Sequence, residues 1–454
     1  MTEQFLAQKC QNVSLQNRAG CATLSALRKT ISSLIAALCL GFAPTRASDF
    51  QGATHLVPLD EDIIDYAKAE PDSAISRLQK KLESDAATLT WDEKFGYLPS
   101  LLTALEVPAS SQMLVFSKTS LQRERISPDN PRAIYFNDDV YIGWIPGAPL
   151  IELSVADPKM GGVFYTIEQK KFERPEFKRT DQCLECHAST KSMGVPGHLV
   201  RSFATDEDGV VDLSSGTSQV NHRTPFEERW GGWYVTGTHG DQTHRGNLIG
   251  KKAFEKQEED PNYAGNLKEL SKFINADKYT SPGSDIVALM VLEHQTHMHN
   301  YIARLQYEAK IALKTYGHVN YLRSIVDGFV RYLLFVDEAP LTAKVSGTST
   351  FQRDFEKLGP RDPKGRSLRE LDLTERMFKY PCSYLIYSAA FDSLPTQVKE
   401  KVYSRLFDVL SGKDTSETYE SLSSESRQAI LEILVDTKSD LPENWKKAAS
   451  NSAS

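Results

Sequence analysis

Cysteine is scarce in this chain, and half of the cysteines lie near the N-terminus. Of six cysteines in 454 residues, three fall within the first 47 residues, which leaves Cys183, Cys186 and Cys382 in the rest. So few cysteines exclude the disulfide framework that stabilises many small exported domains. Cys382 lies in the apolar context Tyr-Pro-Cys-Ser-Tyr-Leu, and we interpret it as a buried, small apolar residue and not as a reactive thiol.

Long hydrophobic runs are also rare. The one conspicuous run, from Ile31 to Ala43, follows Arg28 and Lys29 and is too short to cross a bilayer. A positive flank, an apolar core and a small residue at Ala47 are typical of a secretory signal peptide. We therefore expect residues 1–47 to be a signal peptide that directs the protein to the periplasm, and we expect no membrane span after its cleavage.

An excess of positive charge is absent. The chain holds 53 Lys and Arg against 60 Asp and Glu, for a net charge of −7. Without residues 1–47 the balance is 48 basic to 59 acidic residues, and the net charge is −11. Such a composition does not favour nucleic acid as a partner.

The most informative feature of the sequence is the motif Cys183-Leu184-Glu185-Cys186-His187. Two thiols at this spacing can each add to one vinyl group of a haem, and the histidine that follows is then placed to reach the iron. The pentapeptide is expected by chance in roughly two chains per thousand of this composition. We therefore predict one covalent haem c, with Cys183 and Cys186 as thioether anchors and His187 as the proximal iron ligand.

Two other interpretations of a Cys-x-x-Cys pair are weaker here. A redox-active dithiol of the thioredoxin type would follow a strand and open a helix, and no such unit precedes Cys183. A four-cysteine zinc site would need a second cysteine pair, which the chain lacks.

The signal peptide and the Cys-Leu-Glu-Cys-His motif together resemble a bacterial exported cytochrome c with a single haem. The resemblance implies roles for Cys183, Cys186 and His187 only. The rest of the chain departs from small cytochromes c, because the motif follows predicted strands instead of an N-terminal helix. No methionine beside a proline stands out at the later position where such cytochromes carry their second ligand.

The pattern of apolar residues predicts an α+β protein that is mainly helical, with an antiparallel β-meander before the motif. Alternating runs at 133–136, 140–145, 150–155 and 163–167 are separated by turn residues. Helical spacing dominates residues 58–106 and most of the chain after 284, where we expect helices at 285–309, 321–336, 368–390, 396–411 and 417–436. We predict a haem-bearing domain at 48–250, a linker at 251–283 and a helical domain at 284–454.

The sixth iron ligand is the main open question. On the predicted helix 286–309, His294, His297 and Met298 fall on one apolar stripe, and each is a candidate distal ligand. The competing candidates lie elsewhere in the haem-bearing part, at Met193, His198, His239 and His244. A separate metal site on the same helix is a weaker alternative, because the His-Glu-x-x-His and Glu-x-x-His patterns are absent.

The leading functional hypothesis is a periplasmic c-type cytochrome that transfers electrons to or from an unidentified redox partner protein. The alternative is a haem enzyme or ligand sensor, of an oxidoreductase or peroxidase-like kind, with an open sixth position and a distal histidine for proton transfer. A third hypothesis gives the helical half a scaffolding role, with haem as a stabilising group. The composition does not decide among them.

Overall fold

The computed structural model of the chain describes residues 56–451. The predicted signal peptide, residues 1–47, lies outside these residues. The described residues belong to one compact unit. Among them no helix is both long and apolar enough to cross a membrane.

The centre of the N-terminal half is a six-stranded antiparallel sheet in which each strand pairs with the next along the chain. Its strands are β1 (Met113–Val115), β2 (Arg132–Phe136), β3 (Val140–Trp144), β4 (Leu150–Asp157), β5 (Gly161–Glu168) and β6 (Lys178–Arg179). This order is a meander, so the predicted α+β class and the predicted antiparallel meander are confirmed. The runs of alternating apolar residues were informative because a pleated strand presents successive side chains to opposite faces.

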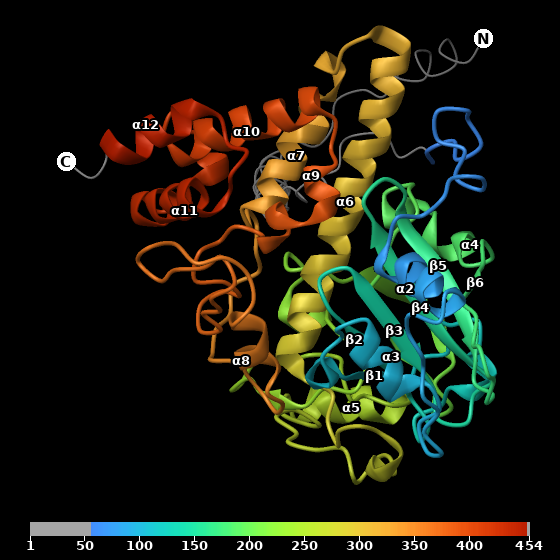
Figure 1. Ribbon diagram of the computed structural model, residues 1–454. Helices are drawn as coiled ribbons and strands as arrows, with labels where there is room; N and C mark the ends of the chain where they lie inside the picture. The colour runs from blue at the N-terminus through green and yellow to red at the C-terminus, as the bar shows by residue number, and fades with distance from the viewer. Residues whose placement is uncertain (1–55, 452–454) are drawn as a thin grey trace, which may run out of the picture. The chain divides into compact units, whose positions relative to one another are not determined.

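The two faces of the sheet pack against different elements. One face carries Ile142 and Leu153, which pair across β3 and β4 and share a core with Leu78 and Leu98. Those leucines belong to α2 (Ala74–Glu83) and α3 (Leu98–Ala104), which lie across the sheet in Figure 1. The opposite face, which includes Tyr141, contributes to the core around the long central helix.

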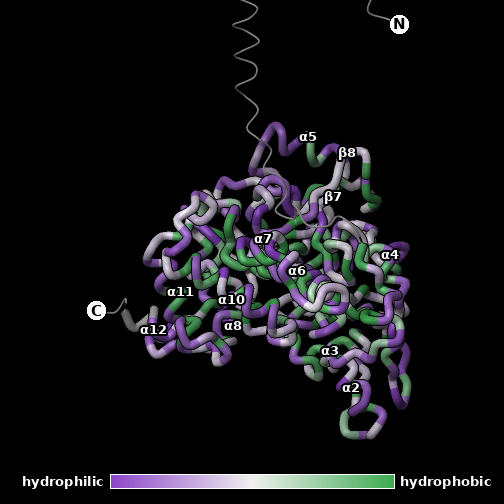
Figure 2. The backbone as a smooth tube through the Cα atoms, turned by 90° about the horizontal axis from the view of Figure 1, so that it is seen from above, coloured by the Kyte–Doolittle hydropathy of each residue, from purple (hydrophilic) through white to green (hydrophobic). Residues whose placement is uncertain are grey.

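That helix is α6 (Ile286–Tyr316), and almost all of its first five turns are buried. It begins where the Asp285 side chain accepts hydrogen bonds from the backbone N–H groups of Val287 and Ala288, and it ends at Gly317 with φ 72°. Figure 1 places α6 between the sheet and the C-terminal helices. In Figure 2 the hydrophobic segments lie mainly toward the middle of the described chain and the hydrophilic segments toward its outside.

The C-terminal half is helical, as the periodicity predicts. Its further helices are α7 (Arg323–Leu333), α8 (Phe351–Glu356), α9 (Ala389–Asp392), α10 (Thr396–Leu410), α11 (Ser424–Thr437) and α12 (Glu443–Asn451). The segment 251–283 contains α5 (Lys251–Glu259) and a 3₁₀ turn at Ala276–Lys278. Its role as a boundary between two domains stays a prediction.

One predicted helix is wrong. Residues 368–390 form turns, a 3₁₀ turn at Tyr384–Tyr387 and the start of α9. The Asp372 side chain accepts hydrogen bonds from the backbone N–H groups of Thr374 and Glu375, and Leu373 has φ 58°. Pro381 adds a position without an N–H donor. These local bonds compete with helix formation, so the apolar spacing of this segment reflects its burial and not a helix.

Three further short strands and one longer one complete the fold. β7 (Arg201–Thr205) and β8 (Val211–Gln219) form a hairpin, and β9 (Gly237–Thr238) pairs with β10 (Ser346–Gly347). The β7–β8 hairpin follows the Cys-x-x-Cys-His motif in the chain, and most of β8 is exposed to solvent.

Candidate functional site

The motif forms a single helical turn just after the last strand of the meander. Leu184–His187 make up α4, and Cys183 occupies the residue before it. The backbone N–H of His187 donates to the carbonyl oxygen of Cys183 at 2.9 Å. Both cysteines are free thiols, Cys183 half-buried and Cys186 exposed. Residues three apart in a helical turn lie on one side, so the two thiols are accessible to one flat ligand.

The ring of His187 is oriented by the loop that follows the turn. Its Nδ1 atom lies 2.9 Å from the carbonyl oxygen of Gly197, ten residues further along the chain. A carbonyl oxygen can only accept, so Nδ1 must carry the hydrogen and Nε2 must be the unprotonated nitrogen. This is the tautomer that a metal requires when Nε2 is the ligand atom.

Gly197 is itself held from three sides. Its N–H donates back to the carbonyl oxygen of His187 at 2.8 Å, and the carbonyl of the preceding Pro196 accepts from Gly162 N–H at 2.8 Å. Gly161, at the β4–β5 turn, has φ 69°, and a Cβ atom there would lie 2.6 Å from the Pro196 carbonyl oxygen. The third side is Asn300 of α6, whose amide binds the N–H and the C=O of His198 at 2.8 and 2.7 Å.

The surroundings of the motif favour a neutral His187 ring and a protonated Cys183 thiol. Burial lowers the pKa of His187, which favours the neutral imidazole that a metal needs. Burial, together with a smaller contribution from the nearby Glu152 carboxylate, raises the pKa of Cys183 to about 11. A thioredoxin-like dithiol depends on a lowered thiol pKa, so this environment does not fit the redox-dithiol interpretation.

The surroundings of the motif combine an aromatic ring with charged side chains. The ring of Phe164 lies 4.8 Å from that of His187. On the same face of the sheet, Arg132 donates to Glu152 at 2.8 Å in a mostly buried ion pair. Arg201, in β7, covers the ring of Phe203 and donates to Thr217 Oγ1 at 3.0 Å.

His294 lies in the core and has both ring nitrogens engaged. Its Nδ1 atom is 2.9 Å from Nδ1 of His222, and its Nε2 atom is 2.8 Å from Oγ of Ser383. The side chain is completely buried. In this arrangement His294 has no nitrogen left to bind iron.

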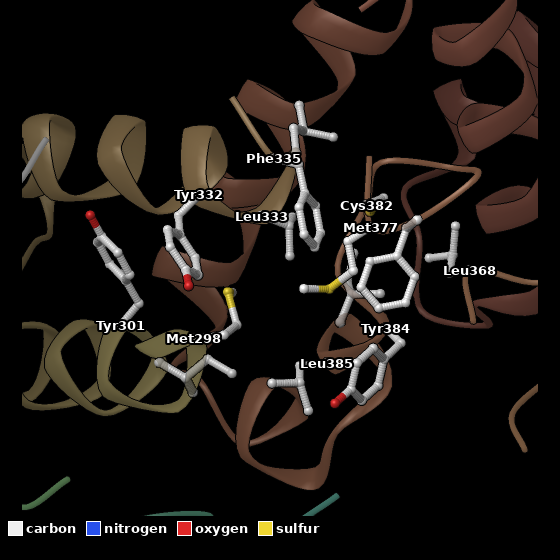
Figure 3. Packing of buried hydrophobic residues seen from close by; sticks show 14 of the residues in the cluster. Met298, Tyr301, Tyr332, Leu333, Phe335, Leu368, Met377, Cys382, Tyr384 and Leu385 are labelled. Carbon is white, nitrogen blue, oxygen red and sulfur yellow. The ribbon is translucent and has the colours of Figure 1, made fainter. Parts of the chain in front are cut away.

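Met298 also belongs to the core. It is fully buried and points among Tyr332, Leu333 and Leu385 (Figure 3). Cys382 lies in the same apolar cluster, and burial raises the pKa of its thiol, in agreement with its interpretation as a small apolar residue.

His297 differs from the other two candidates on α6. It is half-buried, and its Nδ1 atom lies 3.3 Å from Nε2 of Gln219 in β8. Within the part of the chain that the structure describes, its Nε2 atom makes no hydrogen bond. Gln219 pairs with Arg201 across the β7–β8 hairpin, so His297 is connected to the segment that follows the motif.

The competing candidates lie in different surroundings. Met193 is buried, with φ 61°, and its carbonyl accepts from Arg304 at 2.9 Å. The rings of His239 and His244 lie 4.7 Å apart, and each has a nitrogen that accepts a backbone N–H bond. His198 directly follows Gly197, and its Nε2 atom is 3.1 Å from Ser154 Oγ, whereas its Nδ1 atom has no hydrogen-bond partner among residues 56–451.

Two residues that support this site, Gly197 and Asn300, were not predicted from the sequence. The first acts through its backbone carbonyl, and the second acts from α6 across 102 positions of the chain. Only the Pro196-Gly197 turn signal hinted at the first. Across residues 56–451, no three His, Cys, Asp or Glu side chains gather to hold a metal ion by themselves.

Comparison of the chain with family models, curated proteins and solved structures found no match.

Proposed function

We propose that this protein is an exported c-type cytochrome that carries one haem on Cys183 and Cys186 and transfers electrons in the periplasm. The observation that carries the proposal is the hydrogen bond from His187 Nδ1 to the Gly197 carbonyl, beside two free thiols in one helical turn. It leaves Nε2 of His187 unprotonated, as an iron ligand must be.

When bound, the haem would supply an iron that alternates between the ferric and ferrous states. The protein would hold the iron ligand in position and shape the surroundings of the haem. His187 would donate its Nε2 lone pair, and the hydrogen bond at Nδ1 would increase the basicity of the ring. Phe164 would limit the access of water to the ring.

The proposed partner is a redox protein with a basic docking face. The expected mature chain carries a net charge of −11. Attraction between an acidic protein and a basic partner raises the association rate at low salt and weakens as salt screens it.

A second candidate function is a haem enzyme or ligand sensor with an open sixth position. It is favoured by the burial of His294 and Met298 in the core, with both ring nitrogens of His294 engaged. His297 would then be the distal residue, as a proton donor beside the open position.

One experiment tests the proposal and separates the candidates. The full chain is expressed with a cytochrome maturation system, and the purified protein is examined by mass spectrometry and optical spectroscopy. We expect one covalent haem, and none in the Cys183→Ser, Cys186→Ser double variant. A wild-type protein without haem would refute both candidates.

The ligand test uses the same sample. A low-spin spectrum that is unchanged by carbon monoxide or cyanide supports electron transfer, because both axial positions are then filled by the protein. A high-spin spectrum that shifts on ligand addition supports the enzyme or sensor.

A further inference from the structure

A small, partly enclosed cavity lies behind the loop that orients His187. It has a volume of about 10 Å³ and is bounded by the β4–β5 turn, by Gly197 and His198 of the loop, and by His299 and Gln306 of α6. A volume of this size is enough for one water molecule and little else.

Three buried side chains that line the cavity have an unsatisfied polar atom. These atoms are His198 Nδ1, His299 Nδ1 and Gln306 Oε1, and none has a hydrogen-bond partner among residues 56–451. The three side chains are only 4–5% exposed. Leaving a polar atom buried and unpaired costs about 1–3 kcal/mol, so three around one cavity indicate a missing partner.

The roles of two of these atoms follow from their neighbours. Nε2 of His299 lies 2.8 Å from the carbonyl oxygen of Asp138 and must therefore donate to it. A neutral imidazole carries one hydrogen, so Nδ1 of His299 is an acceptor. Gln306 Oε1 is an acceptor as well. Both atoms need a donor in the cavity.

His198 supplies the complementary role. Its Nε2 atom lies 3.1 Å from Ser154 Oγ, a hydroxyl that can donate or accept. If Ser154 donates to Nε2, the ring hydrogen is on Nδ1, and His198 becomes a donor to the cavity. Burial lowers the pKa of both histidines, which keeps both rings neutral as this assignment requires.

We propose that the cavity binds one ordered water molecule that donates to His299 Nδ1 and Gln306 Oε1 and accepts from His198 Nδ1. With its two hydrogens and one lone pair, this water would give each of the three unpaired atoms a hydrogen-bond partner. A cation fits less well, because His198 would have to turn its donor away. The one carboxylate that lines the cavity, that of Asp157, already accepts hydrogen bonds from the backbone N–H groups of Asp72, Lys159 and Met160.

The bound water is part of the support for His187, and this step rests on the proposed haem function. It would hold the side chain of His198, while Asn300 holds the backbone of the same residue through two hydrogen bonds. Gly197, the residue before it, presents the carbonyl that orients His187. Asn300 and the water are therefore positioning groups for the proximal ligand.

A high-resolution crystal structure and ¹⁵N NMR of the histidine rings test the water directly. We expect one water peak in the cavity, His299 with its hydrogen on Nε2 and His198 with its hydrogen on Nδ1. An empty cavity, or His198 with its hydrogen on Nε2, would overturn the proposal. Neither readout depends on haem, so failure of the haem proposal would be recognised separately by an absent haem spectrum.

Two variants extend the test. Gln306→Leu should remove the water and shift the ring ¹⁵N signals of His198 and His299, whereas Gln397→Leu, at an exposed position of α10, should leave both unchanged. Unaltered signals in folded Gln306→Leu protein would contradict the assignment of the water.

The positioning role of Asn300 is tested by measurements that a change in stability alone would not alter. In haem-loaded Asn300→Asp protein, the acceptor for His198 N–H is kept and the donor is lost, so we expect a shifted reduction potential. We also expect about tenfold faster hydrogen exchange at His187 Nδ1 than in the wild type. An unchanged potential and exchange rate would refute this role.

Discussion

Nδ1 of His187 lies 2.9 Å from the carbonyl oxygen of Gly197, and the N–H of Gly197 donates back to the carbonyl of His187 at 2.8 Å. Two residues ten positions apart are thereby locked together by a side-chain and a backbone hydrogen bond. The pair fixes both the direction and the tautomer of the imidazole, so the turn is prepared for a ligand at Nε2 before any ligand binds.

Removal of the His187 imidazole should show the difference between covalent attachment of the haem and ligation of its iron. We expect His187→Ala protein to retain Cys183 and Cys186 and to carry less haem, with a high-spin iron that binds added imidazole. The optical spectrum with and without imidazole is the measurement. A low-spin, imidazole-insensitive spectrum in this variant would show that His187 is not the proximal ligand.

The two histidines on one stripe of α6 should behave differently. His294→Ala removes two buried hydrogen bonds and should lower the unfolding free energy by about 2–4 kcal/mol, with the haem spectrum unchanged. His297→Ala, at a half-buried position, should cost less stability. If His297 binds the iron, only its variant turns the spectrum high-spin, and the reverse result would exclude our assignment.

Substitution of Gly161 should loosen the loop that carries Gly197. A Cβ atom at this position would lie 2.6 Å from the Pro196 carbonyl oxygen, at a backbone φ of 69°. We expect Gly161→Ala to lower the unfolding free energy by about 2–4 kcal/mol in chemical denaturation.

Gly147→Ala is the matched control. Gly147 has φ 73° but no atom within 4 Å of the added Cβ, so only the conformational cost of about 1 kcal/mol remains. Equal effects at the two glycines would show that the close approach to Pro196 does not matter.

Acid should destabilise the protein through its buried histidines. Burial lowers the pKa of His244 to about 3, from an ordinary value near 6.5. The unfolded chain then binds more protons than the folded one between these values, so the unfolding free energy falls as pH decreases from about 6.5 toward 3. Each pH unit costs up to about 1.4 kcal/mol for one such histidine.

Urea titrations at pH 7, 6 and 5 measure this slope. We expect a shallower slope in His244→Asn protein than in the wild type. The same slope in both proteins would mean that His244 takes up its proton in the folded state as readily as in the unfolded state.

Loss of a fully buried ion pair should lower the unfolding free energy more than loss of an exposed one. Arg229 and Glu293 form a salt bridge with almost no solvent exposure, and Trp230 also donates to Glu293 at 2.9 Å. Glu293→Gln leaves the guanidinium without its counter-charge and should cost about 3–5 kcal/mol of stability. Asp72→Asn, which breaks an exposed pair with Arg77, should change stability little in the same denaturation assay.

Much of the fold could be predicted from local patterns. Strands β2 to β5 alternate or run apolar between turn residues, and the stripe that includes His294, His297 and Met298 falls on a helix whose first turns are buried. The helix predicted at 368–390 is wrong, because apolar spacing there reflects burial and side-chain hydrogen bonds at Asp372 determine the local backbone.

The sequence by itself determined the chemistry available at the motif: two thiols and an imidazole at the spacing that haem attachment requires. Only the tertiary structure decided how those groups are supported and which distant histidine remains available. The carbonyl of Gly197 and the amide of Asn300 act on the motif through contacts across the chain, and His294 is engaged by Ser383, 89 positions away. Such contacts have no periodicity or spacing in the sequence, because they depend on how the sheet, the loop and α6 pack against one another.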